Sequence, residues 1–148
     1  MTQTSHPTHL VLYADDDIDD IRFVEESFSE ATRNIELITA YNGLDLIRYL
    51  ESLNQRDPDP CLIILDVNMP MMNGKEALQR IRQMERFQNI PVVLFTTSST
   101  EVDKNFATKY NAGFVTKPLD NRQMKNITAQ FIDHCADEVQ KHIRKSYN

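Results

Sequence analysis

Cys61–Asp66 (CLIILD) is an aliphatic run that ends in a carboxylate, and the rest of the sequence repeats this pattern. Similar short apolar runs occur at Leu10–Ala14, Ile35–Ala40, Pro91–Phe95 and Ala112–Val115, and longer segments with helical spacing of apolar residues separate them. Alternation of short strands with helices is typical of a parallel sheet that is covered on both faces.

The five runs predict an α/β fold with a doubly wound, five-stranded parallel sheet in the order 2-1-3-4-5, a flavodoxin-like arrangement with helices on both faces. The first, third and fourth runs are almost purely aliphatic, as expected of central strands. The second run carries Glu36 and Thr39, which favours a position at the edge of the sheet.

The last helical pattern extends from Asp120 to Lys145. As a single extended helix it would be about 39 Å long, roughly twice the length of a six-residue strand. Val139 and Ile143 would then overhang the sheet. Because an exposed apolar stripe is poorly tolerated, one expectation is that these residues are buried in a partner or in a homodimer through the C-terminal helix region. The alternative is that the end of this helix is a frayed tail.

Length and charge limit the classes of function. The 148 residues suffice for one compact domain, and we expect a flexible tail over residues 1–8 followed by a single domain over 9–148. Lys and Arg number 16 against 22 Asp and Glu, a net charge of −6, which disfavours binding to nucleic acid or to an anionic membrane. The polar N-terminus lacks the pattern of a secretion signal, so a cytoplasmic location is expected.

Polar side chains follow four of the predicted strands. Asp15 and Asp16 close the first, Asp66 the third, Thr96 the fourth and Lys117 the fifth. In a doubly wound sheet these strand ends meet at one edge, where ligands bind. Carboxylates brought together there repel one another unless a cation intervenes, and oxygen ligands with few protein donors suit Mg²⁺. The pattern therefore indicates a magnesium site that is suited to phosphoryl chemistry.

A structural role is the alternative explanation for several polar residues near the strand ends. Asp17, Asp19 and Asp20 stand at the start of a predicted helix, where carboxylates stabilise the helix N-terminus. For these three residues we favour the capping interpretation. Asp66, Thr96 and Lys117 could each have an ordinary structural role, but their joint occurrence at strand ends favours a site.

Four stretches of the sequence together resemble the receiver (phosphoacceptor) domain of two-component response regulators, of the stand-alone chemotaxis type. They are residues 11–17 (VLYADDD), 64–74 (ILDVNMPMMNG), 91–97 (PVVLFTT) and 113–118 (GFVTKP). The resemblance extends from about Leu10 into the last predicted helix.

This resemblance implies a role for several residues. Asp66 would accept a phosphoryl group from a sensor histidine kinase or a phosphotransfer protein. Mg²⁺ would be bound by Asp16, Asp66 and the backbone carbonyl of Asn68, with Asp15 acting through a water molecule. The same likeness favours a cis bond between Lys117 and Pro118.

Three further side chains complete the implied switch. Lys117 would pair with the phosphoryl group, Thr96 would move to bond it, and Phe114 would turn inward in response. Phe114 lacks a hydroxyl group, so its rotamer change would depend on packing alone.

We expect the chain to signal by contact with a downstream protein target, because the pattern after Pro118 leaves room for only one more helix. The chain would then be no enzyme beyond catalysing its own phosphorylation and dephosphorylation. One alternative is a Mg²⁺-dependent phosphohydrolase with an aspartyl nucleophile. Such enzymes typically carry an acid two residues after the nucleophile, where this chain has Asn68. Another alternative is a binding module that works without phosphorylation.

Overall fold

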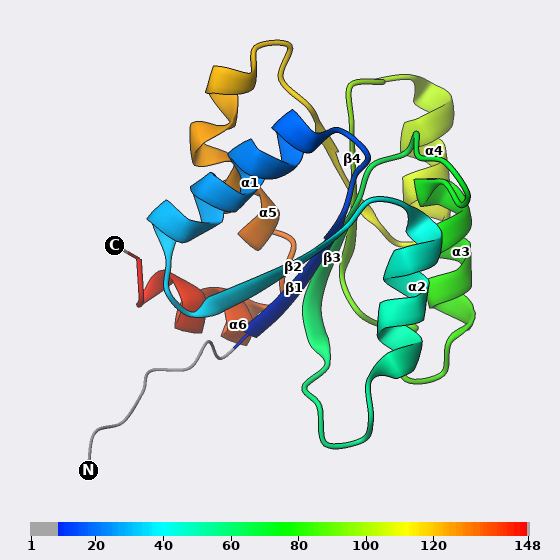
Figure 1. Ribbon diagram of the computed structural model, residues 1–148, viewed down its shortest axis with the longest axis horizontal. Coiled ribbons are helices and arrows are strands. Elements are labelled where there is room, and N and C mark those ends of the chain that lie inside the picture. Colours follow the sequence, from blue (N-terminus) through cyan, green and yellow to red (C-terminus); the bar gives the residue numbers. More distant parts are fainter. Residues whose placement is uncertain (1–8, 148) are drawn as a thin grey trace.

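The computed structural model describes residues 9–147, which form a five-stranded parallel sheet in the order β2-β1-β3-β4-β5 with helices on both faces (Figure 1). The predicted fold class and strand order are therefore confirmed. The predicted tail over residues 1–8 lies outside the described residues. The elements are β1 (His9–Ala14), α1 (Ile18–Ala31), β2 (Ile35–Ala40), α2 (Gly43–Ser52), β3 (Pro60–Leu65), α3 (Gly74–Gln83), β4 (Val92–Thr96), α4 (Glu101–Lys109), β5 (Gly113–Thr116), the 3₁₀ helix η1 (Asn121–Asn126), α5 (Ile127–Ile132) and α6 (Asp137–Arg144).

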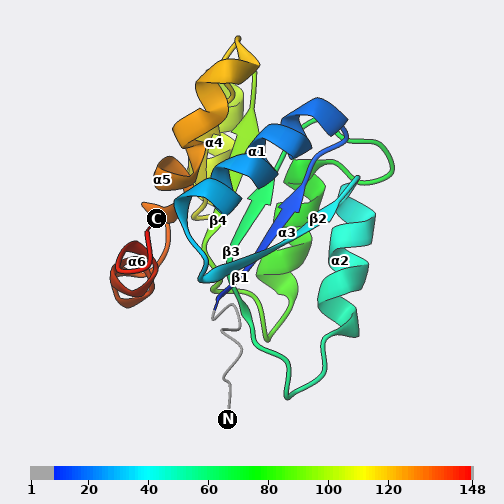
Figure 2. The same cartoon turned by 60° about the vertical axis from the view of Figure 1, so that its left-hand side comes forward.

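Two apolar layers hold the helices on the sheet. α1, α5 and α6 cover one face (Figure 2), and α2, α3 and α4 cover the other (Figure 1). Successive side chains of a strand point to opposite faces. In β3, Leu62 and Ile64 accordingly join the cluster under α1 and α5, whereas Ile63 and Leu65 join the cluster under α2 and α3. A strand that is buried on both faces needs an unbroken aliphatic run, which is the feature seen in the sequence.

β2 lies at one edge of the sheet, as its polar residues indicated. Its residues are partly or fully exposed, whereas every residue of β4 is buried. The difference follows from position, because β4 has a neighbouring strand on both sides and helices above and below.

The expectation of one helix from Asp120 to Lys145 is wrong. The segment contains η1, α5 and α6, and the chain turns between Ile132 and Asp137. The apolar spacing continues through this turn because both helices bury their inner faces, so periodicity alone could not reveal it. The Gln140 side chain donates hydrogen bonds to the carbonyls of Asp133 and Cys135, which satisfies acceptors left open at the end of α5.

This turn also removes the reason for expecting a homodimer through the C-terminal helix region. Ile143 is fully buried within its own chain, and Val139 packs against the same apolar cluster. No apolar stripe of α6 overhangs the sheet.

The expected cis bond between Lys117 and Pro118 is also wrong, because no cis peptide bond occurs in the described range.

Two arginines connect the loops at the amino ends of the strands. The Arg82 guanidinium donates to the carbonyls of Gln88, Ile90, Tyr110 and Asn111 at 2.7–3.1 Å. Arg86 donates to the carbonyls of Leu53, Asn54 and Asp57 and to the Asp59 carboxylate. The loops that precede β3, β4 and β5 are thereby fixed by charge-assisted hydrogen bonds.

Within residues 9–147, no helix is both long enough and apolar enough to cross a membrane.

Candidate functional site

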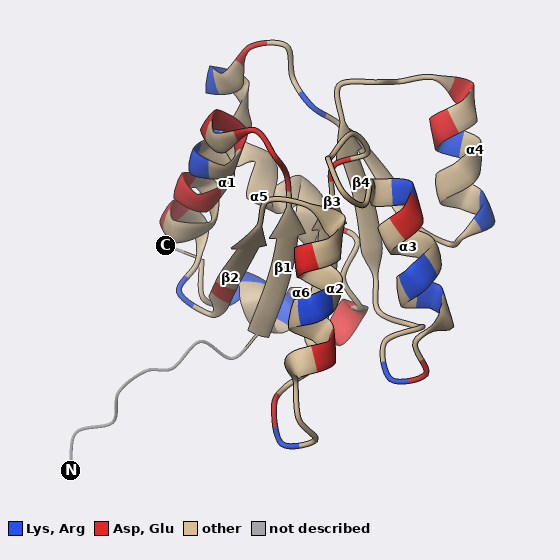
Figure 3. Cartoon of the chain, turned by 45° about the vertical axis from the view of Figure 1, so that its right-hand side comes forward, with Lys and Arg blue, Asp and Glu red and all other residues tan. Residues whose placement is uncertain are grey.

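The strand-end residues singled out in the sequence meet at one edge of the sheet. Asp15 and Asp16 follow β1, Asp66 follows β3, Thr96 ends β4 and Lys117 follows β5. Oxygen atoms of the carboxylates of Asp15, Asp16 and Asp66 lie within 4.8 Å of one another. The acidic turn between β1 and α1 is visible at this edge in Figure 3. The parallel topology therefore gathers the acids as predicted.

Asp15 is the most deeply buried of these acids. It has no exposed surface, and one of its oxygens, Oδ2, accepts a hydrogen bond from the Tyr13 hydroxyl at 2.5 Å and contacts Lys117 Nζ at 2.7 Å. Its other oxygen accepts from the Asp17 N–H at 2.9 Å. These contacts leave Asp15 few free lone pairs. Asp16, in contrast, is exposed to solvent.

Asp66 is buried but only weakly bound. Its side chain is 9% exposed, and its two oxygens have long contacts of 3.4 Å, one to the Asn68 N–H and one to Lys117 Nζ. Burial, together with the negative charge of Asp15, raises the pKa of Asp66 to about 7. Asp66 is therefore a carboxylate with accessible lone pairs in a site that carries excess negative charge.

Lys117 supplies the positive charge of the cluster. Its Nζ atom lies 2.7 Å from Asp15, 2.7 Å from Asp20 and 3.4 Å from Asp66. Burial lowers the pKa of Lys117, but the surrounding carboxylates raise it more, and the net direction is upward. The ammonium also lies over the ring of Phe95, 5.4 Å from its centroid. Lys117 therefore stays charged.

Asp20 is the site residue that the sequence analysis missed. Asp17 does cap α1, accepting hydrogen bonds from the N–H groups of Asp19 and Asp20, so the capping interpretation is confirmed for Asp17. The Asp20 side chain instead turns inward and pairs with Lys117, so capping was the wrong interpretation for Asp20. A signal was present: Asp20 stands four residues before Val24, within the buried stripe of α1.

Thr96 and Phe114 occupy the positions expected of them. Thr96 is buried at the end of β4, and its hydroxyl accepts a hydrogen bond from the Ser98 N–H at 3.2 Å. Phe114 lies in β5 opposite Leu94 of β4, partly buried against the apolar cluster on the α4 side. Movement of either residue between two states stays a prediction.

Two close backbone contacts fix the loop after Asp66. A Cβ atom on Gly74 would lie 2.1 Å from the Asp66 carbonyl oxygen, and one on Gly43 would lie 2.5 Å from the Met72 carbonyl oxygen. Both distances are too short for any other residue, so α3 and α2 approach the loop through glycine. Met71 within the loop has a φ of 67°, a conformation that is uncommon outside glycine.

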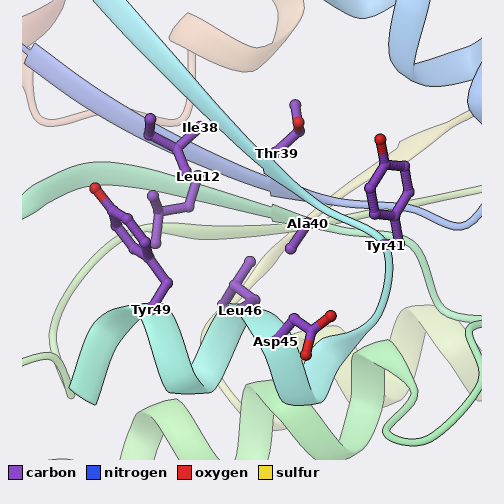
Figure 4. A pocket seen from close by; sticks show the side chains of 8 residues that line it. All are labelled: Leu12, Ile38, Thr39, Ala40, Tyr41, Asp45, Leu46 and Tyr49. Atoms are coloured by element: carbon purple, nitrogen blue, oxygen red, sulfur yellow. The ribbon is translucent and has the colours of Figure 1, made fainter. Parts of the chain in front are cut away.

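An apolar pocket of about 180 Å³ lies between β2 and α2. Leu46 and Tyr49 extend into it from α2 toward Ile38 and Ala40 of β2 (Figure 4). Its lining does not include the strand-end acids or Lys117. The pocket therefore does not belong to the acidic site.

The acidic site has the properties of a cation site. Asp15, Asp20 and Asp66 surround the ammonium of Lys117, and Asp16 lies beside Asp15 and Asp66, so negative charge is in excess. Carboxylate oxygens are preferred ligands of hard divalent cations. One face of the site is open to solvent at Asp16, which gives an ion and an anionic group access.

Comparison with known proteins gives a consistent result. Residues 11–129 match the response regulator receiver domain family. Response regulator Rcp1 of Synechocystis sp. is 36% identical over 105 residues, which cover 70% of this chain and 71% of Rcp1. Sensor histidine kinase CheAY of Helicobacter pylori is 26% identical over 132 residues, which cover 88% of this chain but 16% of CheAY.

Solved structures show the same similarity. The Mn²⁺-bound form of response regulator Rcp1 aligns with a TM-score of 0.72 and 30% identity, covering 82% of this chain and 92% of that one. The phosphorylated cyanobacterial phytochrome response regulator RcpA aligns with a TM-score of 0.76 and 26% identity, covering 86% of this chain and 96% of that one.

Proposed function

This chain belongs to the response regulator receiver family of two-component signalling, and we propose that it accepts a phosphoryl group on Asp66 in a Mg²⁺-dependent reaction. The observation that supports this most strongly is the geometry of Asp66. Its carboxylate lies within 4.8 Å of two further acids and within 3.4 Å of a buried ammonium, yet its own hydrogen bonds are long.

The residues at the site fit Mg²⁺. Asp16 and Asp66, with the backbone carbonyl of Asn68, would hold the ion directly, and Asp15 would act through a water molecule. The contacts that Asp15 already makes to Tyr13, Lys117 and Asp17 support this indirect role, because they leave it few free lone pairs. Mg²⁺ would neutralise the carboxylates and the incoming phosphoryl oxygens. Rcp1 has been crystallised with Mn²⁺, a cation of the same charge.

The reaction assigns a role to each side chain. An oxygen of Asp66 attacks the phosphorus atom of a phosphohistidine or an acyl phosphate, and the bond from phosphorus to the donor breaks. Lys117 neutralises charge on the transferred group, and it is already held beside Asp66 by Asp15 and Asp20. Thr96, at the end of the adjacent strand, offers a hydroxyl to a phosphoryl oxygen.

Output by protein contact completes the proposal. A phosphoryl group adds about two negative charges next to Thr96 and Lys117, which changes the contacts that these residues make. Phe114 would respond through its packing in β5. The partners are a sensor histidine kinase or a phosphotransfer protein upstream and a protein target downstream, in the cytoplasm. The chain would turn over no separate substrate.

Phosphorylation by a small donor tests this function. Wild type mixed with acetyl phosphate and Mg²⁺ is expected to gain the mass of one phosphoryl group in intact mass spectrometry, and Asp66→Asn is expected to gain none. Asp137→Asn, which changes an exposed carboxylate on α6, serves as the control and should behave as wild type. An unchanged wild-type mass, or equal labelling of Asp66→Asn, would contradict the proposal.

A further inference from the structure

Two carboxylates compete with Asp66 for the Lys117 ammonium. Nζ lies 2.7 Å from both Asp15 and Asp20, but 3.4 Å from Asp66. The longer distance is at the outer limit of a hydrogen bond. The ammonium is therefore held mainly by Asp15 and Asp20, although it stands beside Asp66.

Asp20 reaches Lys117 from a helix rather than from a strand end. It lies in the first turn of α1, and its N–H donates to the Asp17 side chain at 3.1 Å, which fixes this turn. The residue is 6% exposed and is followed by the buried Ile21. The Asp20 carboxylate therefore has little freedom to leave the ammonium for solvent.

We propose that Asp20 is a positioning residue that keeps the Lys117 ammonium from a short contact with Asp66, and that its charge opposes accumulation of the phosphoryl group on Asp66. The inference rests on the proposed function. With acetyl phosphate, a bond forms between an Asp66 oxygen and phosphorus while the bond from phosphorus to the acetyl oxygen breaks, and acetate leaves. The phosphoryl group on Asp66 then shares one ammonium with the Asp20 carboxylate.

The size of the effect follows from the geometry. Two anions that bind one ammonium lie about 5 to 6 Å apart, two hydrogen-bond lengths. At an effective dielectric constant of about 20, this repulsion changes an equilibrium by about a hundredfold. Lys117 and a bound cation screen much of it, so we expect about a tenfold effect.

The decisive measurement compares variants of Asp20. With excess acetyl phosphate and Mg²⁺, intact mass spectrometry gives the rate constants of phosphorylation and dephosphorylation. Asp20→Asn and Asp20→Ala, which both remove the charge, are expected to raise the ratio of the two constants about tenfold. Asp20→Glu keeps the charge and is expected to return the ratio toward that of wild type.

Asp19→Asn is the matched control. It removes the same charge from the same turn of α1, but Asp19 is exposed and does not contact Lys117. It should leave the ratio unchanged. An equal effect of Asp19→Asn would show that general charge, not the contact with Lys117, is responsible, and would overturn the inference.

A second readout is independent of phosphorylation. Calorimetry without a donor should show Mg²⁺ binding several-fold more weakly to Asp20→Asn than to wild type, because one anion has left the cluster. Equal ratios in wild type and the two neutral variants would overturn the inference while leaving the proposed function intact. Failure of wild type itself to become phosphorylated would overturn both.

Discussion

At the carboxyl ends of the strands, the Lys117 ammonium faces three carboxylates, whereas at the amino ends the Arg82 guanidinium faces four backbone carbonyls. The first arrangement leaves negative charge in excess, because one cation is shared among several anions. The second leaves no anion unpaired, because carbonyl oxygens are neutral. At the carboxyl ends of the strands, the charged side chains thus leave excess negative charge, which favours a cation. At the amino ends, they fix loops.

Removal of the Lys117 charge should give the largest effect. Lys117→Met leaves Asp15, Asp20 and Asp66 buried without a counter-charge, and loss of one partner of a buried ion pair costs about 3 to 5 kcal/mol. We expect the free energy of unfolding, measured with urea at pH 8 in EDTA, to fall by that amount. Lys109→Met, at an exposed position of α4, is the control. A loss below about 1 kcal/mol would show that the carboxylates do not need Lys117.

Asp66 should give the metal-free protein an unusual dependence on pH. Its pKa is raised from 3.8 to about 7, so between these values the folded chain holds a proton that the unfolded chain has released. The free energy of unfolding therefore falls as pH rises from about 4 to about 7, by a few kcal/mol at most.

The test of this dependence uses a difference between two proteins. In EDTA, the Tm of wild type relative to Asp66→Asn should fall between pH 5 and pH 8. Mg²⁺ competes with the proton for the carboxylates, so it should raise the Tm of wild type more at pH 8 than at pH 5. A relative Tm that stays constant or rises across this range is the contrary result.

Changes at the amino ends should affect stability alone. Arg82→Ala removes the donors to four carbonyls and is expected to cost about 2 kcal/mol. Arg86→Ala should cost less, about 1 kcal/mol, because Arg86 is more exposed. Neither change should alter Mg²⁺ affinity in calorimetry. Arg80→Ala, at an exposed position of α3, is the control for both. A weaker Mg²⁺ affinity in Arg82→Ala would show that the amino and carboxyl ends of the strands are coupled.

The sequence predicts the sheet and most of the site for a simple reason. Parallel strands place their carboxyl ends together, so the residue after each aliphatic run is located once the strand order is known. Asp66 and Lys117 are found in this way. The loop conformation at Met71 and the close approaches at Gly43 and Gly74 depend on neighbouring elements, and no short pattern in the sequence records them.

The interpretations of Asp20 and of the last helix were wrong for different physical reasons. Asp20 shares its residue type and its helix turn with the capping acids, and only its place in the buried stripe of α1 distinguishes it. The turn between α5 and α6 is hidden because residues on both sides keep a spacing of four. Phe131 and Ile143 are both fully buried, although they belong to different helices.

Through Gly43 and Gly74, residues outside the acidic cluster can affect the conformation of the loop after Asp66. Each permits a helix to touch the backbone of the loop, near Met72 and Asp66 respectively. A single added methyl group at position 43 would force either the Met72 carbonyl or α2 to shift, and a shift of Met72 acts on the loop that includes Asn68. The spacing of the proposed metal ligands could thus be tuned by substitution at a residue that carries no functional group, without altering any charge in the site.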